Sequence, residues 1–61
     1  MKGYRPEALL RARAARALTQ AEVARRIGVS VATVCRWEAG RSWPRAGHLH
    51  RIEQWLKRRG R

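Results

Sequence analysis

The sequence predicts an all-α fold, a compact single domain of four or five short helices. Strong helix formers (alanine, leucine and arginine) dominate residues 7–17. Farther along, apolar residues recur at helical spacing, and glycine, proline and N-cap residues divide the chain into short segments. A chain of 61 residues forms one domain at most. We therefore expect 1–61 to be a single unit, with a loose arm over 1–5 and a basic tail over 57–61.

The net charge is the strongest functional signal in the composition. The chain has 15 lysines and arginines against 4 acidic residues, a formal charge of +11, and its pI is near 11.9. A pI above about 9 in a compact domain points first to nucleic acid, although an acidic protein or an anionic membrane surface would also attract such a chain. A core this small leaves little room for an enclosed active site, so we expect no enzyme.

Several kinds of site and location are disfavoured by the residues present. No apolar run approaches the roughly 20 residues of a membrane span, and we expect neither a membrane partner nor a signal peptide. The single Cys35 excludes an intrachain disulfide and a cysteine-built zinc site. His48 and His50 have no carboxylate or cysteine at metal-ligand spacing, so we expect no metal, cofactor or small-molecule ligand. A reducing, nucleic-acid-containing compartment such as the cytoplasm fits best.

The first helix is expected over residues 7–17. Pro6 suits the first turn because its missing N–H has no partner there in any case. The residues that fall near one face of this helix, and form a thin stripe, are Leu9, Leu10, Arg13, Ala14 and Ala17.

The second helix is expected to begin after Thr19 and to be barely two turns long. Thr19 and Glu22 have the spacing of a capping box, in which each side chain satisfies a free backbone N–H near the other. Leu18 can pack against this helix as a hydrophobic staple. Gly28 ends the helix because a C-terminus favours a left-handed residue. The buried stripe consists of Val23, Ala24 and Ile27.

The third and fourth helices follow from the same signals. Ser30 is a preferred N-cap for a helix over about 31–39, and Gly40 ends it. Pro44 can open a last helix after a short loop, although Gly47 is unfavourable in its first turn. The inward-facing residues are expected to be Val34 and Trp37 on the third helix, and Leu49, Ile52, Trp55 and Leu56 on the fourth.

The stretch from Gln20 to Trp37 carries the functional motif. Two short helices joined by a glycine-containing turn must cross steeply, because the connection is too short for antiparallel packing. The crossing requires a small residue at the contact, which Ala24 supplies, and an apolar anchor on the second helix, which Val34 supplies. With Gly28 at the turn, the sequence predicts a helix-turn-helix.

This pattern resembles the phage repressor and Cro-like helix-turn-helix family, often called the XRE family. The resemblance covers about Pro6 to Leu56. It implies a lambda-repressor-like all-helical fold and a transcriptional regulator of operator DNA, commonly a homodimer. Many members have a fifth helix that often forms the dimer interface, whereas this chain continues into a basic tail. The matching segments are 18–24, 28–30, 33–34 and 36–40, together with Pro44.

The resemblance also implies roles for individual residues on double-stranded DNA. Val31, Ala32 and Arg36 match the base-facing positions, and Thr33 and Cys35 lie beside them. An arginine can bond both O6 and N7 of a guanine, and a small apolar side chain can contact a thymine methyl. At the phosphates, the family uses the glutamine and nearby N–H groups at the start of the second helix. The phosphate-contacting candidates are Gln20, Thr19, Arg41 and Arg45.

A structural role is expected for other prominent residues. The resemblance implies an ion pair between Arg13 and Glu38 that ties the first helix to the end of the third. Trp37 and Trp55 are expected in the core. Trp43 lies in a polar loop, where packing, a DNA-backbone contact and a partner contact are equally compatible with the sequence.

Three classes of function are compatible with these observations. The first is a sequence-specific regulator that represses from a two-fold operator as a homodimer, whether a Cro-like repressor, an antitoxin-type autorepressor or an accessory regulator. The second is the DNA-binding module of a transposase or recombinase, which would require a catalytic domain. The third is an RNA-binding or structural basic protein, which would favour exposed aromatics on a sheet or a low-complexity basic tract. The sequence favours the first.

Overall fold

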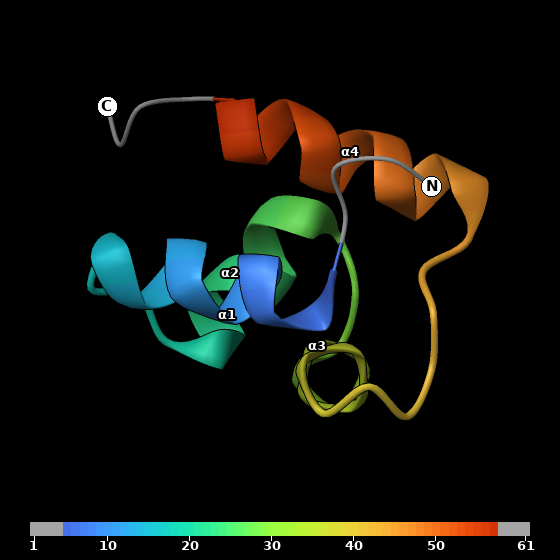
Figure 1. The fold of residues 1–61 in the computed structure, drawn as a ribbon, viewed down its shortest axis with the longest axis horizontal. Coiled ribbons are helices and arrows are strands. Elements are labelled where there is room, and N and C mark those ends of the chain that lie inside the picture. The colour runs from blue at the N-terminus through green and yellow to red at the C-terminus, as the bar shows by residue number, and fades with distance from the viewer. Residues whose placement is uncertain (1–4, 58–61) are drawn as a thin grey trace.

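The computed structural model describes residues 5–57, and within that range the protein contains four helices and no strand (Figure 1). The predicted all-α class is confirmed. Apart from Arg5 and Lys57, the predicted arm and basic tail lie outside the described residues. None of the helices in the described range is long and apolar enough to cross a membrane. The helices are α1 (Pro6–Ala15), α2 (Gln20–Ile27), α3 (Val31–Glu38) and α4 (Ala46–Lys57).

The ends of α2 and the start of α3 are fixed by local hydrogen bonds. Thr19 Oγ1 accepts the backbone N–H of Glu22 at 3.1 Å, and Glu22 Oε1 accepts the backbone N–H of Thr19 at 2.8 Å. Gly28 ends α2 with φ +94°, in the left-handed region. Ser30 Oγ then accepts the backbone N–H of Thr33 at 3.2 Å and caps α3. The predicted capping box, glycine stop and serine cap are therefore confirmed.

The stripe expected on α1 is only partly buried. Leu9 is fully buried, but Leu10 is 41% exposed, and Ala14 and Ala17 are also exposed. The helix ends at Ala15, and Ala17 adopts a left-handed conformation with φ +55°. The long arginine side chains explain the difference: the residues one and two turns after Leu9 are Arg13 and Arg16, which turn inward to make specific contacts. The face bearing Leu10 is left to solvent.

Helix α4 begins later than expected, at Ala46 rather than at Pro44. Pro44 is buried in the loop before the helix, and the backbone N–H of Leu49 donates to the carbonyl of Arg45 at 2.7 Å. Gly47 lies exposed in the first turn, where no side chain is required. The expected apolar side of α4 is otherwise present, because Leu49 and Ile52 are buried and Trp55 and Leu56 pack partly buried at the edge of the core.

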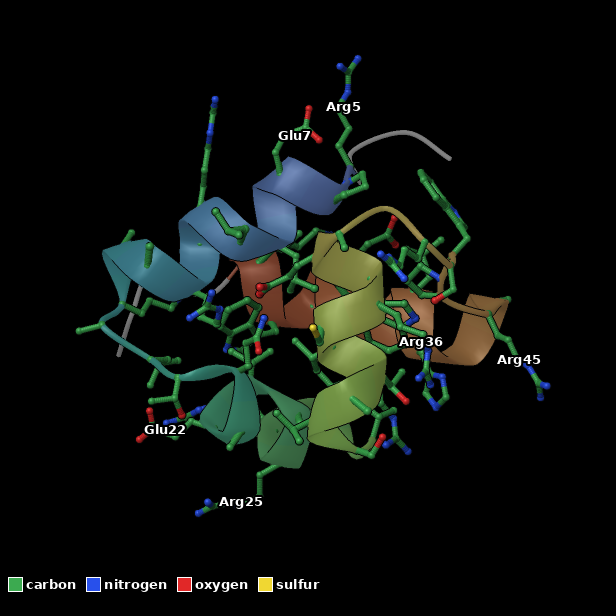
Figure 2. All side chains as sticks on the ribbon, turned by 90° about the horizontal axis from the view of Figure 1, so that it is seen from below. Arg5, Glu7, Glu22, Arg25, Arg36 and Arg45 are labelled. Atoms are coloured by element: carbon green, nitrogen blue, oxygen red, sulfur yellow. The ribbon has the colours of Figure 1, made fainter. Side chains whose placement is uncertain are left out.

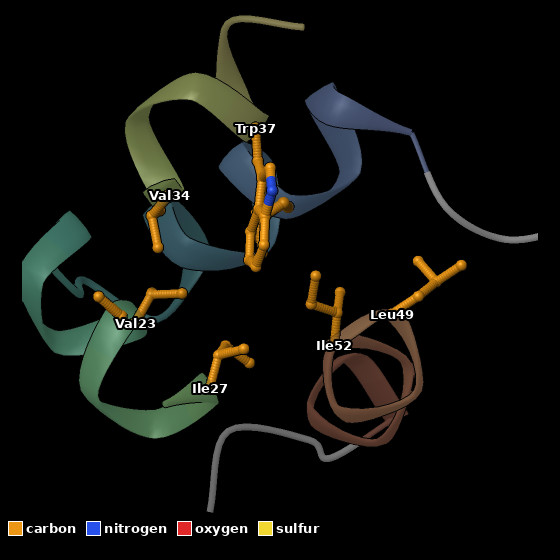
Figure 3. Packing of buried hydrophobic residues seen from close by; sticks show 8 residues of the cluster. Val23, Ile27, Val34, Trp37, Leu49 and Ile52 are labelled. Carbon is orange, nitrogen blue, oxygen red and sulfur yellow. The ribbon is translucent and has the colours of Figure 1, made fainter. Parts of the chain in front are cut away.

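A single apolar core joins all four helices (Figure 3). Within residues 5–57 no polar or charged residue is buried as a whole, although the side chain of Glu38 is only 3% exposed. Full burial of one large aliphatic or aromatic side chain contributes about 1.5–3 kcal/mol, so the loss of any one contact would matter in so small a domain. The core residues are Leu9 from α1, Val23, Ala24 and Ile27 from α2, Val34 and Trp37 from α3, and Leu49 and Ile52 from α4.

The core sits between two helices that lie on opposite sides of the molecule. Figure 1 shows α4 running along the top and α3 end-on at the bottom, with α1 and α2 between them. Helix α2 packs chiefly against α3, its neighbour across the turn. This arrangement leaves the side of α3 that faces away from the core open to a partner.

Candidate nucleic-acid interface

Helix α3 has one buried side and one open side. Val34 and Trp37 face the core, whereas Val31 is 48% exposed and Ala32 is exposed with it. Because side chains three to four positions apart share a helix face, the sequence separates the anchoring residues from the open ones. The open residues that were expected to read bases are Val31, Ala32, Cys35 and Arg36, while Thr33 is half-buried.

Arg36 carries the only charge among the open residues of α3. Figure 2 views the protein from the side of α3 and shows the Arg36 side chain on this open surface, with Arg45 toward the same side of the helix. Arg36 Nη2 lies 3.5 Å from Thr33 Oγ1, one turn earlier in the helix. The Thr33 hydroxyl is in turn 2.9 Å from Ser30 Oγ. Thr33 therefore links the cap of α3 to Arg36.

The end of α3 is fixed by an ion pair with α1. Arg13 Nε donates to Glu38 Oε2 at 2.7 Å, and Arg13 Nη2 donates to Glu38 Oε1 at 3.1 Å, a two-pronged contact. The side chains are 20% and 3% exposed, respectively. The hydrogen bonds to Glu38 raise the pKa of the Arg13 guanidinium above its ordinary value, against the opposing effect of its burial. The structure thus brings together the two residues predicted to pair.

Glu38 also binds a residue that was expected at the phosphates. Gln20 Nε2 donates to Glu38 Oε1 at 2.9 Å, and Arg13 Nη1 donates to the carbonyl of Leu18 at 3.0 Å. The first turn of α2 is therefore tied to the last turn of α3 and to α1. Sequence reasoning missed this contact, because the two side chains are 18 positions apart and nothing local in the sequence relates them.

The remaining candidates lie around α3 without forming one cluster. Thr19 is committed to the capping box at the start of α2. Arg41 and Arg45 are exposed at either end of the loop after α3, and Trp43 between them is 54% exposed. Trp43 is therefore not a core residue, whereas Trp37 is.

The two acidic residues near the interface already make hydrogen bonds within the fold. Glu38 is the carboxylate of the ion pair, and Glu22 is half of the capping box. The pKa of Glu22 lies below its ordinary value, mainly because its carboxylate accepts the backbone N–H of Thr19, with further contributions from the Thr19 side chain and from Arg26 and Arg25. The exposed arginines around α3 thus present positive charge to a partner.

Histidine and cysteine contribute no metal centre in the part of the chain that the structure describes, where no three potential ligands gather. The His48 ring lies 5.7 Å from that of Trp37, tilted by 51°, and so packs beside the core. Cys35 is exposed on α3 and forms no disulfide.

Helices α2 and α3 are short and capped, they cross at a left-handed glycine, and one side of α3 is open. This arrangement defines a helix-turn-helix DNA-binding protein. Comparison with known families agrees, since the family model described as helix-turn-helix matches residues 9–58. The chain belongs to this helix-turn-helix family, of the phage repressor and Cro-like (XRE) type. It is a DNA-binding regulator whose partner is double-stranded DNA. No curated protein and no solved structure matches the chain.

Proposed function

We propose that the protein is a repressor that binds a specific operator by inserting α3 into the major groove. The observation that carries this proposal is the division of α3 into a buried side and an open side that bears Val31, Ala32 and Arg36. In the proposed complex, Arg36 bonds O6 and N7 of a guanine, and Val31 or Ala32 contacts a thymine methyl. Thr33 and Cys35 line the edges of this contact.

The phosphates are proposed to bind beside α3. The first N–H groups of a helix have no acceptor within the helix, and the capping box uses those of Thr19 and Glu22. The backbone N–H groups at Gln20 and Ala21 are left to bind a phosphate, with help from the positive end of the helix dipole. The hydrogen bond from the Gln20 side chain to Glu38 would hold this end of α2 in register with α3.

Arg41 and Arg45 are proposed to bind phosphate from the loop on the other side of α3. Both are exposed, and an arginine fork matches the geometry of a phosphate. These contacts would fix the orientation of α3 in the groove without reading sequence.

The operator is proposed to be two-fold symmetric. Helix α3 has 8 residues, so it is about 12 Å long and can span only about three to four base pairs. Such a short reading surface gives limited specificity, which a second protomer on a half-site about 34–36 Å away would extend. A homodimer on a promoter would repress by occupancy, in the cytoplasm of a bacterium or of a phage-infected host. This mechanism needs no catalytic residue, and we propose no enzymatic activity.

Selection of bound duplexes from a random DNA pool, at salt near physiological, tests this proposal. We expect an enriched two-fold symmetric motif whose half-site spacing reports the dimer geometry. An enriched asymmetric motif would retain specific reading but contradict the symmetric dimer. Binding without enrichment that collapses as salt rises would contradict sequence-specific reading, because counterion release alone produces that behaviour.

A further inference from the structure

A second positively charged surface lies between α2 and α4. It is an open groove of about 340 Å³. Arg26 from α2 and His50, Arg51 and Gln54 from α4 are exposed there, and Trp55 is half-buried. We call this surface the basic groove, and its lining residues are Arg26, His50, Arg51, Gln54 and Trp55.

The basic groove is lined largely by α4, and α4 lies on the opposite side of the molecule from α3 (Figure 1). Its residues do not overlap those proposed to contact bases or phosphates. A partner bound in the groove would therefore leave the open side of α3 available to DNA.

Among residues 5–57, none that lines the basic groove carries a carboxylate. Glu53 precedes Gln54 in α4 but is not among the residues that line the groove. Glu22, one turn before Arg26, lies outside the groove lining and bonds to Thr19 in the capping box, although its charge interacts with that of Arg26. Arg51 uses Nη1 to bond the carbonyl of Ile27 at 3.0 Å, and the rest of its guanidinium stays available. The groove is consequently complementary to a negatively charged ligand.

The setting of Trp55 indicates which kind of anion fits. The guanidinium carbon of Arg16 lies over the Trp55 ring, 4.6 Å from its centroid, and the ring packs against the core. Single-stranded nucleic acids are bound by stacking bases on open aromatic faces, and here Arg16 covers a face of the ring. The duplex is proposed to lie against α3, on the opposite side of the molecule from α4 (Figure 1), so it would not reach the groove. An extended peptide would fit the groove if it placed carboxylates against Arg26 and Arg51 and an apolar side chain against the edge of the Trp55 indole.

We propose that the basic groove binds a short acidic segment of a partner protein, so that the DNA-bound regulator contacts a second protein through α4. Carboxylates of the segment pair with Arg26 and with the free part of Arg51, the amide of Gln54 bonds its backbone, and an apolar side chain rests against Trp55. Hydrogen bonds of this kind between charged groups are the stronger ones in proteins.

The test measures binding of a fluorescent acetylated peptide of alternating glutamate and leucine to the full chain by fluorescence polarisation. The same peptide with glutamine in place of glutamate is the ligand control. We expect the glutamate peptide alone to bind and to remain bound when the protein is saturated with a DNA duplex. Displacement of the peptide by the duplex, or equal binding of the glutamine peptide, would overturn the proposal.

Substitutions locate the peptide on the protein. We expect Arg26→Gln combined with His50→Gln to weaken peptide binding about tenfold or more, and Gln54→Glu to weaken it similarly by adding a negative charge to the groove. The matched controls are Arg25→Gln, next to Arg26 but outside the groove, and Arg36→Gln on α3; both should bind the peptide almost normally. Equal losses in the controls would mean that net charge alone attracts the peptide. A complex that holds two duplexes and no peptide would assign the groove to DNA instead.

Discussion

Arg13 Nε lies 2.7 Å from Glu38 Oε2, although the two residues are 25 positions apart in the chain. Glu38 is the more buried partner, and it also accepts the amide of Gln20 at 2.9 Å. One carboxylate thus joins α1, the start of α2 and the end of α3. The proposed orientation of α3 on DNA depends on this junction as well as on the core.

We expect Arg13→Ala to destabilise the protein strongly. The substitution leaves the Glu38 carboxylate buried without its counter-charge, and breaking such a pair costs about 3–5 kcal/mol when burial is complete. Because Arg13 is partly exposed, we expect about 2–3 kcal/mol, measured as a lower urea midpoint. Arg11→Ala, an exposed substitution on the same helix, should change stability by less than about 0.5 kcal/mol. Equal losses for the two variants would contradict the structural role of Arg13.

We expect stability to fall in acid in a way that depends on Glu22. Its pKa in the folded protein lies below the ordinary value, so the capping box stabilises fully above the ordinary glutamate pKa, near about 4.3. That contribution is lost as pH falls below this value and through the folded pKa. Thermal melts between about pH 6 and pH 3 should show a smaller acid-induced decrease in Tm for Glu22→Gln than for the native chain.

The serine cap of α3 supplies the control for this pH dependence. Ser30 caps without a carboxylate partner, so Ser30→Ala should cost about 1 kcal/mol at every pH and leave the acid-induced decrease unchanged. A native-like decrease in Glu22→Gln would show that another group causes the loss.

On DNA, we expect Arg36→Ala to weaken binding to the selected operator while leaving binding to random duplex nearly intact. A bidentate guanine contact discriminates by about 1–3 kcal/mol. Arg41→Ala should instead weaken both kinds of binding and reduce the salt slope by about one, as loss of a phosphate contact does. Fluorescence anisotropy across a salt series distinguishes the two. If Arg36→Ala weakened binding to the operator and to random duplex equally, the proposed role of Arg36 in reading bases would be contradicted.

We expect Gly28→Ala to be destabilising through two separate effects. Position 28 has φ +94°, where an L side chain costs about 1–2 kcal/mol, and the added Cβ would lie 2.9 Å from Arg51 Nη1. The Arg51 side chain must then shift, and we expect its hydrogen bond to Ile27 to weaken. In urea denaturation, the double variant should lose less free energy of unfolding than the sum of the losses in Gly28→Ala and Arg51→Ala. The reason is that both single substitutions affect the same hydrogen bond. If the two losses of unfolding free energy simply added, Gly28→Ala would not act through the hydrogen bond between Arg51 and Ile27.

The local signals in the sequence predicted the ends of α2 and the start of α3 because they act between near neighbours, whereas the end of α1 and the start of α4 were placed two residues off. Thr19 with Glu22, Gly28 and Ser30 each control the backbone within one turn, so their spacing alone specifies the ends of α2 and the start of α3. The motif of Ala24, Gly28 and Val34 similarly predicted a helix-turn-helix, and the comparison with known families confirmed the family that the wider stretch resembles.

The features that the sequence did not predict depend on long-range contacts. The burial of α1 was assigned partly to the wrong residues because alanine suits either side of a helix, and the inward turn of Arg16 becomes visible only with Trp55 beside it. The hydrogen bonds from Gln20 to Glu38 and from Arg51 to Ile27 join residues 18 and 24 positions apart. The basic groove likewise requires α4 to lie against α2, which no local spacing encodes.

The two-sided construction of α3 has a consequence for how such a regulator can change its target. Val34, Trp37 and Glu38 hold the helix in place, and Val31, Ala32 and Arg36 contribute little to the core. Exposed substitutions of this kind usually alter stability by less than about 0.5 kcal/mol. Under the proposed reading of bases by these outer residues, new DNA preferences would arise by exchanging them alone, while the scaffold beneath them keeps folding. The same property makes the domain a suitable starting point for regulators engineered to bind new operators.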